Sequence, residues 1–538
     1  MACVTQTVVP EAPAADQSPT LGGWIHRHRI GLLALLVLFG ALIRVHGLTS
    51  GSLFTDDAWV AITNHESFST ALRMLVTTPG FTLFERSWSG LAPHTTWFIQ
   101  LPSLVASLAG IVAVYALCRY FQFEAWISLV AASIIAISAE ATAFATHIKP
   151  YPFDLLTAAC LLWLGERARR NPDWSSLIAL AALSVASCAW SFTNAVIVMA
   201  VYLVLAAVCL RRRSFTAPFL ATAGVAAGLI ASLYLFVIKP QVTPALSAYW
   251  KTSYIDTRSI HVWLHSTRAS ISSLFTVELG RPSNHHLLHA AGTLYGDLLL
   301  GLAVLGAIVA WRKNAMPLAA LGLAYVLAAA HKIPLGSNRT DAYLFPAVLL
   351  LIASSLQWLA AVLHRSAPRW ITTIATAAVC LGVVLGGISG LTNPPRYIGG
   401  DLSAAMPEVR HALSQPGTMV LIEPGTRFVW AYEHDAGAKI IFGPTFNTGY
   451  SFVSSDPRIV IVPNTPEEPS FSLAPSIAKL AAADHLVTVG YQIPSFPLDQ
   501  VITARALEAA CWVQTSSRLV DQFQVATYEC TRHGCVPA

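Results

Sequence analysis

Long apolar runs alternate with short polar connections along most of this 538-residue chain. A membrane-spanning helix needs about 20 mainly apolar residues to cross a hydrocarbon core of about 30 Å, and about eleven runs reach or approach that length. The pattern therefore predicts a polytopic α-helical membrane protein. We expect the spans at residues 30–48, 97–117, 125–145, 151–165, 174–190, 195–210, 217–238, 294–311, 315–330, 343–363 and 370–391.

The composition agrees, because 55% of the residues are hydrophobic and 11% are charged, whereas a soluble domain has about a quarter charged residues. Basic residues gather in short connections of one parity, which the positive-inside rule assigns to the cytoplasm. The N-terminus is then inside, and the long connections 49–96 and 239–293 and the chain after 392 are outside. The net charge of +5 mostly reflects this bias, so it gives no reason to expect a nucleic-acid partner.

Three regions follow from this topology. Residues 1–29 have the composition of a disordered cytoplasmic tail, and no cleavable signal is evident. Residues 30–392 form the transmembrane domain, and residues 393–538 form a second, extracytoplasmic domain. In that domain strand patterns alternate with helical ones, which predicts an α/β layer. The strands are expected at 418–423, 439–443, 458–462, 485–491 and 523–530, and the helices at 403–413 and 501–512.

The external loop 49–96 is too long to be a plain connector. Residues 67–78 have helical spacing and begin with a serine, so we expect one or two amphipathic helices lying on the outer leaflet. The loop 239–293 is expected beside it. The C-terminal domain is expected to pack on these loops, either to help recognise an acceptor or as a scaffold.

Three cysteines, Cys511, Cys530 and Cys535, lie in the external domain, where an oxidising environment allows disulfides. A Cys511–Cys530 bridge is expected, with Cys535 as the competitor. No Cys or His pattern in the sequence has the spacing of a zinc site.

Ionisable residues collect at the external ends of the spans, where charge is costly unless it is paired or functional. Two adjacent acids, Asp56 and Asp57, follow the first span. A cluster of cations facing an acid pair could hold a phosphate leaving group while a carboxylate takes the proton of an incoming hydroxyl. The basic residues at the same side are Arg44, His147, Lys149, His331 and Arg339.

Each of these residues also has a purely structural interpretation. Arg44 can snorkel to lipid head groups or pair with a loop acid, and Lys149 and Arg339 can mark the ends of spans. Adjacent acids at the start of a loop are often a helix cap. The functional interpretation therefore requires that these residues converge in the fold.

Three stretches resemble lipid-linked-sugar glycosyltransferases of the C superfamily. "ALIRVHGLTSGSLFTDDAW" (41–59) is similar to the segment in which an Arg at the end of the first span precedes an acid pair and an aromatic. "ISAEATAFATHIKPYPFDLL" (137–156) resembles the stretch with a basic residue, Pro and Tyr that opens their fourth span. "LGSNRTDAYLFPAVLLL" (335–351) matches their late external Arg before a Tyr and a Pro.

The resemblance covers roughly residues 30–391 and is closest to the protein O-mannosyltransferase, aminoarabinose transferase and bacterial mannosyl- or arabinosyltransferase branches. The chain departs from them at three positions. Asp57 stands where many members have Glu, Lys149 where they have Arg, and Gln100 where they have Arg before "PS".

The resemblance implies an enzyme that moves a sugar such as mannose or arabinose from a polyprenyl phosphate to a hydroxyl of an envelope glycan, lipid or protein. The transfer would occur on the extracytoplasmic face of the plasma membrane, with inversion at the anomeric carbon. The abundance of Ala, and of Arg over Lys, fits a high-GC bacterium.

The same resemblance implies a role for each site residue. Asp56 is expected to be the base, and Asp57 to orient the loop, assist, or coordinate an ion. Some branches use a divalent metal, but this sequence shows no ligand set that requires one. The donor phosphate is expected to contact Lys149, Arg339, Arg44 and His147, and the donor or acceptor to contact Tyr151, Tyr343 and His331.

Other classes share parts of the pattern. A lipid or glycan transporter or flippase predicts Gly/Pro-broken helices repeated in two halves and charges near the midplane, and neither is clear here. An O-antigen ligase-like transferase would place its key Arg and His in a late loop, without an acid pair after the first span. A non-catalytic assembly subunit would tolerate replacement of Asp56 by Asn, whereas a transferase would lose turnover but still bind the donor.

Overall fold

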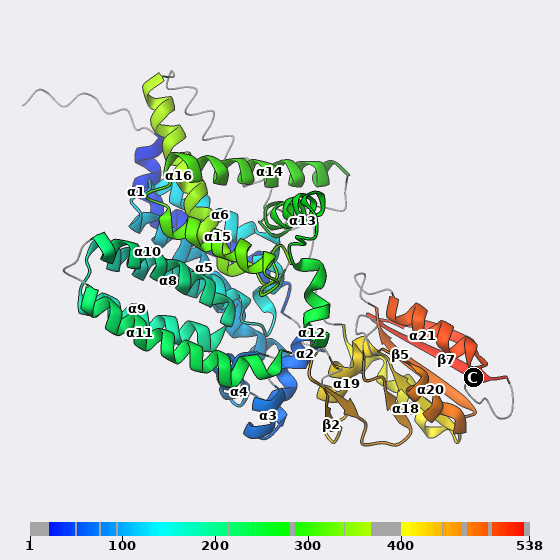
Figure 1. The fold of residues 1–538 in the computed structure, drawn as a ribbon. Helices are drawn as coiled ribbons and strands as arrows, with labels where there is room; N and C mark the ends of the chain where they lie inside the picture. Colours follow the sequence, from blue (N-terminus) through cyan, green and yellow to red (C-terminus); the bar gives the residue numbers. More distant parts are fainter. Residues whose placement is uncertain are drawn as a thin grey trace, which may run out of the picture.

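The apolar runs form helices close to their predicted positions, and a sheet forms near the C-terminus (Figure 1). The computed structural model describes residues 21–48, 51–74, 77–92, 95–211, 216–242, 244–279, 286–337, 339–366, 400–443, 446, 448–464, 471–492 and 498–531. The helices before the sheet are α1 Leu21–Val45, α2 Thr55–Ala61, α3 Phe68–Met74, α4 Pro79–Ser89, α5 Thr96–Tyr120, α6 Ala125–Ile137, α7 Ala139–Ala143, α8 Tyr151–Arg170, α9 Trp174–Trp190, α10 Ala195–Arg211, α11 Thr216–Leu233, α12 Pro244–Tyr249, α13 Ile260–Ser272, α14 His286–Val309, α15 Ala315–Ala329 and α16 Phe345–Ser366.

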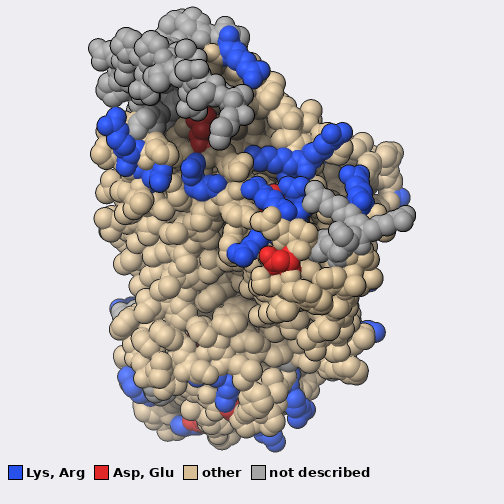
Figure 2. Space-filling model, turned by 90° about the vertical axis from the view of Figure 1, so that its left-hand side faces the viewer, with Lys and Arg blue, Asp and Glu red and all other residues tan. Residues whose placement is uncertain are grey.

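Within the described residues, six helices are long and apolar enough to cross a membrane, and a bent pair makes up to seven. The predicted count of about eleven is therefore not established. Helix α8 carries charges at its C-terminal end, α9 and α15 are shorter apolar helices, and the predicted span 370–391 lies outside the described residues. Figure 2 shows a broad uncharged belt between two charged regions of one face, as a multi-pass membrane protein requires.

The bent pair departs from the predicted continuous span 125–145. Helices α6 and α7 meet at an angle of 57° because Ser138 leaves the helical conformation, with φ −51° and ψ 134°. The Ser138 hydroxyl accepts a hydrogen bond from the Ala141 amide and donates one to the Glu278 carbonyl, at 3.3 and 2.8 Å. Irregular backbone at membrane depth needs such internal partners, since no water reaches it.

The N-terminal boundary also differs from the prediction. Helix α1 begins at Leu21, so the part of the predicted tail from 21 to 29 is helical, and residues 1–20 lie outside the described residues. Its apolar section continues the first span backwards to Trp24.

The connection 49–96, predicted to be external, carries three short helices within its described residues, α2, α3 and α4. Ser67 precedes α3, and its hydroxyl accepts a hydrogen bond from the Thr70 amide at 3.1 Å, which supports the expected cap. Helix α4 packs against the end of α9, where a Cβ at Gly80 would lie 2.7 Å from the Ala189 carbonyl oxygen. The loop is therefore an ordered layer that presents α2 to its neighbours.

The C-terminal part is an α/β layer, as predicted. Its five-stranded sheet has the order β4-β1-β5-β7-β6; β1 is parallel to β4 and β5, and β7 is antiparallel to β5 and β6. A separate hairpin pairs β2 with β3. The strands are β1 Thr418–Ile422, β2 Lys439–Phe442, β3 Tyr450–Val453, β4 Ile459–Ile461, β5 His485–Tyr491, β6 Trp512–Val520 and β7 Phe523–Cys530, and the helices are α18 Met406–Ser414, α19 Arg427–Glu433, α20 Ala474–Lys479 and α21 Leu498–Ala509.

Two details of this part correct the sequence predictions. The helix predicted over 501–512 ends at Ala509, because Cys511 has a φ of +67° and Trp512 begins β6. Cys530 is disulfide-bonded but Cys511 is not in a disulfide, so the predicted Cys511–Cys530 bridge is wrong. The partner of Cys530 lies outside the described residues.

The two faces of the five-stranded sheet are covered differently. One face packs on α20 and α21. The other packs on α18 and α19 and shares a single hydrophobic core with residues 53–62 of the connection 49–96. The sheet is thus joined through α19 to α2, the helix that carries the acid pair (Figure 1).

Candidate active site

Helix α2 places the two adjacent acids in its first turn, where negative charge interacts favourably with the helix dipole. Successive side chains on a helix are turned by about 100° from each other, because a turn takes 3.6 residues. Asp56 and Asp57 therefore point in different directions, and the structure gives them different surroundings. Asp57 is fully buried, whereas the Asp56 side chain is 27% exposed.

Asp57 joins the loop to the segment before α8. One of its oxygens lies 2.7 Å from His147 Nδ1, and the other accepts a hydrogen bond from the Ile148 amide at 2.8 Å. The His147 ring is itself 2% exposed and lies against Phe54 and Phe144. Asp57 thus links the loop to His147 and Ile148, and its predicted role, to orient the loop, assist or coordinate an ion, stays a prediction.

Asp56 faces a cation from a segment far away in the sequence. Arg339 Nη1 donates a hydrogen bond to Asp56 Oδ2 at 3.1 Å, and the guanidinium lies 5.9 Å from the Tyr249 ring centroid. Burial raises the pKa of Asp56, but attraction to Arg339, Lys149 and His147 outweighs it, so the pKa lies below its usual value. Asp56 is therefore ionised at neutral pH and able to accept a proton.

Lys149 completes this group from the N-terminal end of α8. The residue before a proline avoids the helical region, and Lys149 precedes Pro150, which in turn precedes the first residue of α8. Its Nζ lies 4.4 Å from the centroid of the Trp59 ring, and it is 5% exposed. Burial lowers the pKa of Lys149, and the charges of Asp56 and Asp57 oppose that change.

Arg44, also predicted to bind the donor phosphate, is held elsewhere. It is fully buried, and its guanidinium donates hydrogen bonds to the carbonyls of Ile135 and Ala136 at 2.9 and 2.7 Å. These carbonyls end α6 at the break before Ser138, where the helix leaves them without intrahelical partners. The geometry gives Arg44 a structural role at the bend and does not support a phosphate contact.

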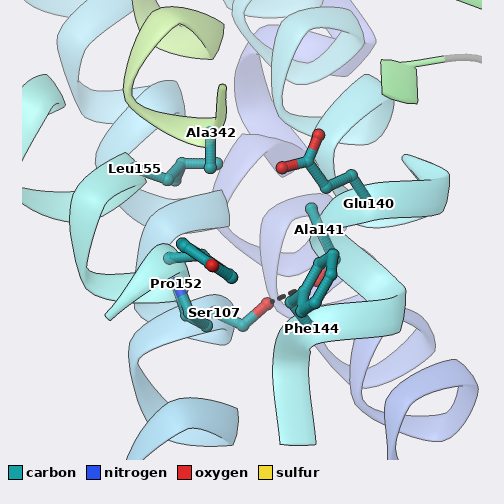
Figure 3. A pocket seen from close by; sticks show the side chains of 8 residues that line it. Ser107, Glu140, Ala141, Phe144, Pro152, Leu155 and Ala342 are labelled. Atoms are coloured by element: carbon teal, nitrogen blue, oxygen red, sulfur yellow. Dashed lines mark hydrogen bonds between the residues drawn. The ribbon is translucent and has the colours of Figure 1, made fainter. Parts of the chain in front are cut away.

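Tyr151, Tyr343 and His331, which were predicted to contact the donor or the acceptor, lie in different surroundings. Tyr151 lines a pocket of about 10 Å³ (Figure 3), roughly the size of one water and too small for a sugar ring. Figure 3 shows Glu140 in the same pocket, with its carboxylate turned toward Leu155 and Ala342.

Tyr343 is 1% exposed in a turn before α16. His331 is exposed, stacks on Tyr254 at 5.2 Å, and approaches the Ile255 carbonyl at 3.3 Å. No contact of either residue with Asp56 appears among the described interactions, so their donor or acceptor roles stay predictions.

Glu85 is an acid that the sequence analysis did not single out. It lies on α4, is 2% exposed, and is close enough to Asp57 for the two charges to interact. Burial raises the pKa of Glu85 to about 8, and the negative charge of Asp57 adds to this. Nothing in the sequence around Glu85 distinguishes it from a surface acid on an amphipathic helix, so only the packing of α4 reveals it.

Part of the chain matches a known protein family. Residues 77–236 match the family model described as dolichyl-phosphate-mannose-protein mannosyltransferase. This match supports a likeness of that segment to glycosyltransferases of the C superfamily. The resemblance stated from the sequence is confirmed at this level, and the match supports glycosyltransferase activity. The matched segment contains Lys149 but neither Asp56 nor Arg339.

Several solved structures are similar to the chain at low identity. The Saccharomyces cerevisiae protein O-mannosyltransferase Pmt1-Pmt2 complex bound to the sugar donor is 16% identical over 39% of this chain and 32% of its own, with a TM-score of 0.29. The Archaeoglobus fulgidus oligosaccharyltransferase in the apo form is 12% identical over 76% and 64%, with a TM-score of 0.40. This chain thus spans less than two thirds of either protein.

ArnT from Cupriavidus metallidurans in the apo state is 13% identical over 93% of this chain and 98% of its own, with a TM-score of 0.36. The same protein is also known bound to undecaprenyl phosphate. No curated protein sequence matches the chain. None of these likenesses is close enough to assign a substrate.

Proposed function

We propose that the chain transfers a sugar from a polyprenyl phosphate to an acceptor hydroxyl at the external end of its membrane helices, with Asp56 as the base. The observation that carries this proposal is the meeting of Asp56, Arg339 and Lys149 from three distant segments. The family model, whose description names a dolichyl-phosphate-mannose donor, supports a lipid-phosphate donor and favours mannose. An arabinose-like sugar and a glycan, lipid or protein acceptor remain within the proposal.

The charges suit the chemistry of such a transfer. The acceptor hydroxyl loses its proton to Asp56 as its oxygen bonds to the anomeric carbon. The bond from that carbon to the phosphate oxygen breaks, and the electron pair leaves with the polyprenyl phosphate. Lys149 and Arg339 would stabilise the charge that develops on the leaving phosphate. Attack opposite to the leaving group inverts the anomeric carbon.

The two acids have separate roles in this scheme. Asp56 is partly exposed and touches Arg339, so it can meet an acceptor. Asp57 is buried against His147 and the Ile148 amide, and we assign it the positioning of the segment that bears Lys149. No step in the scheme requires a metal, and no group of three or more His, Cys, Asp or Glu suited to a metal is found among the described residues.

The test is mass spectrometry of lipid-linked and envelope glycans from cells with and without the gene for this chain. We expect a polyprenyl-phosphate sugar to accumulate and one glycosylated product to disappear when the gene is absent. Complementation with Asp56→Asn should leave both changes in place. Restoration of the product by Asp56→Asn would overturn the assignment of the base, and unchanged glycans in the gene's absence would overturn the transferase.

A further inference from the structure

The C-terminal α/β part touches the loop that carries the acid pair through one carboxylate. Glu433 is the last residue of α19, and α19 packs on α2. One Glu433 oxygen accepts a hydrogen bond from the Ser52 hydroxyl at 2.6 Å, and the other accepts one from the Leu53 amide at 3.2 Å. The two residues of the Ser52 contact are 381 positions apart in the chain.

The same hydroxyl is held from a second side. Ser52 is 1% exposed, and its oxygen accepts a hydrogen bond from the Leu402 amide at 2.8 Å. Burial raises the pKa of Glu433 to about 7, while the hydrogen bonds from Ser52 and Leu53 oppose the change. The two carboxylate oxygens of Glu433 thus pair with two buried donors, the Ser52 hydroxyl and the Leu53 amide. Either donor would be costly to leave without a partner.

This contact lies directly before the helix that carries Asp56. The first backbone hydrogen bonds of α2 run from the Asp57 and Ala58 amides to the Phe54 carbonyl, both at 2.9 Å. Fixing Ser52 and Leu53 thus fixes the start of α2, and Asp56 is the second residue of that helix.

The C-terminal part also holds the other end of α2. The Tyr450 hydroxyl donates a hydrogen bond to the Trp59 carbonyl at 3.0 Å, and the Trp59 ring lies beneath the Lys149 ammonium. Phe428 packs on the same indole with centroids 6.1 Å apart. Both the acid and the cation of the candidate site therefore rest on residues that the C-terminal part contacts.

We propose that Glu433 is a positioning residue that sets the place of Asp56 for sugar transfer, so that the C-terminal α/β part belongs to the active site. The inference rests on the proposed function of Asp56. It differs from the expectation of a separate acceptor-recognition module, because the contact acts on the base and not on a ligand.

The test compares Glu433→Gln with wild type in the full chain. A glutamine amide presents one acceptor and one donor, so one of the two donors at Ser52 and Leu53 loses its partner. We expect release of polyprenyl phosphate from polyprenyl-phosphate mannose in native membranes to slow by about 10- to 100-fold. The KM for the donor should change by less than about threefold, because Lys149 and Arg339 remain. Glu433→Asp, which keeps both acceptors on a shorter side chain, should recover part of the loss.

Hydrogen exchange supplies a readout that does not depend on transfer. The Asp57 and Ala58 amides should exchange faster in Glu433→Gln than in wild type, at unchanged thermal stability of the membrane helices. The matched control is Glu408→Gln, which removes a carboxylate from the same part of the chain that pairs with exposed Arg518. This control should change neither turnover nor exchange.

The outcomes separate the two proposals. Normal turnover in Glu433→Gln, or an equal loss of donor binding and turnover, overturns the positioning role. If wild type releases no polyprenyl phosphate from either polyprenyl-phosphate mannose or polyprenyl-phosphate arabinose, the proposed function fails, and faster exchange of the α2 amides then still shows that Glu433 holds the loop. Unchanged exchange overturns the inference in either case.

Discussion

Replacing Asp56 with Asn should abolish most turnover while sparing the fold and the donor site. Asparagine keeps the shape of the side chain but cannot accept the acceptor's proton. A positioned general base contributes about 10²- to 10⁴-fold, which corresponds to about 3–5 kcal/mol of activation free energy at 1.36 kcal/mol per decade. Because the Asp56 and Arg339 side chains are part-buried, at 27% and 18% exposed, loss of the ion pair should cost less folding free energy than the roughly 3–5 kcal/mol of a fully buried pair.

Donor binding should respond in the opposite direction. Asp56 neutralises Arg339 at 3.1 Å and lies near Lys149, so its removal leaves both cations more available to a phosphate. We therefore expect the Kd for polyprenyl-phosphate mannose to stay the same or fall, while turnover falls by at least about 100-fold.

The assay is donor binding and product release with purified protein in lipid nanodiscs. Asp256→Asn is a matched control, since Asp256 is also 27% exposed and pairs with an arginine, Arg258, in the connection 239–293. It should leave both quantities unchanged. The reasoning is refuted if Asp56→Asn keeps more than about a tenth of wild-type turnover, or if donor binding and turnover fall together.

Three further predictions concern neighbouring groups. Asp57→Asn should lower the thermal stability by about 1–3 kcal/mol, because the amide cannot accept from both His147 and the Ile148 backbone; an unchanged melting temperature in detergent would contradict this. Donor affinity should fall as the pH rises and Lys149 loses its proton. Because burial lowers the pKa of Lys149, this fall should occur below pH 10.5, the usual pKa of lysine. In Lys149→Arg, titration of donor binding should show the fall at a higher pH than in wild type. The folding stability of the wild type should decrease as pH rises from about 4.5 to about 8, since Glu85 holds its proton more tightly in the folded protein than in the unfolded chain. Thermal melts at pH 5 and pH 9 should show this decrease in wild type but not in Glu85→Gln. An equal decrease in the variant would exclude Glu85 as its source.

The membrane helices were predictable because their signal is local. Helix α9 spans Trp174–Trp190 as predicted, and α15 ends one residue before its predicted end. The bend at Ser138 was not predictable from hydropathy, because residues 125–145 are mainly apolar, with Glu140 as the one charged residue, and a serine within a helix is not itself a break. The bend depends on the Glu278 carbonyl and the Arg44 guanidinium, which arrive from other segments.

The strands show the same division. Strands β1, β5 and β7 carry buried apolar runs and were expected within a residue or so of their bounds. Strand β6 was missed because eight of its nine residues are not buried. It forms as an edge strand because it pairs with β7. Its own sequence shows no apolar periodicity that would predict a strand.

The amino-acid sequence alone determined that this is a polytopic helical membrane protein with a C-terminal α/β part, and it pointed to Asp56, Lys149 and Arg339 as one group. Hydropathy and charge distribution are properties of neighbouring residues, so they can be read along the chain. Only the tertiary structure decided that Asp57 is buried while Asp56 meets Arg339, that Arg44 serves the α6 end, and that Glu433 reaches Ser52. These outcomes depend on which distant segments pack together, and that packing sets the burial and the partner of each charge.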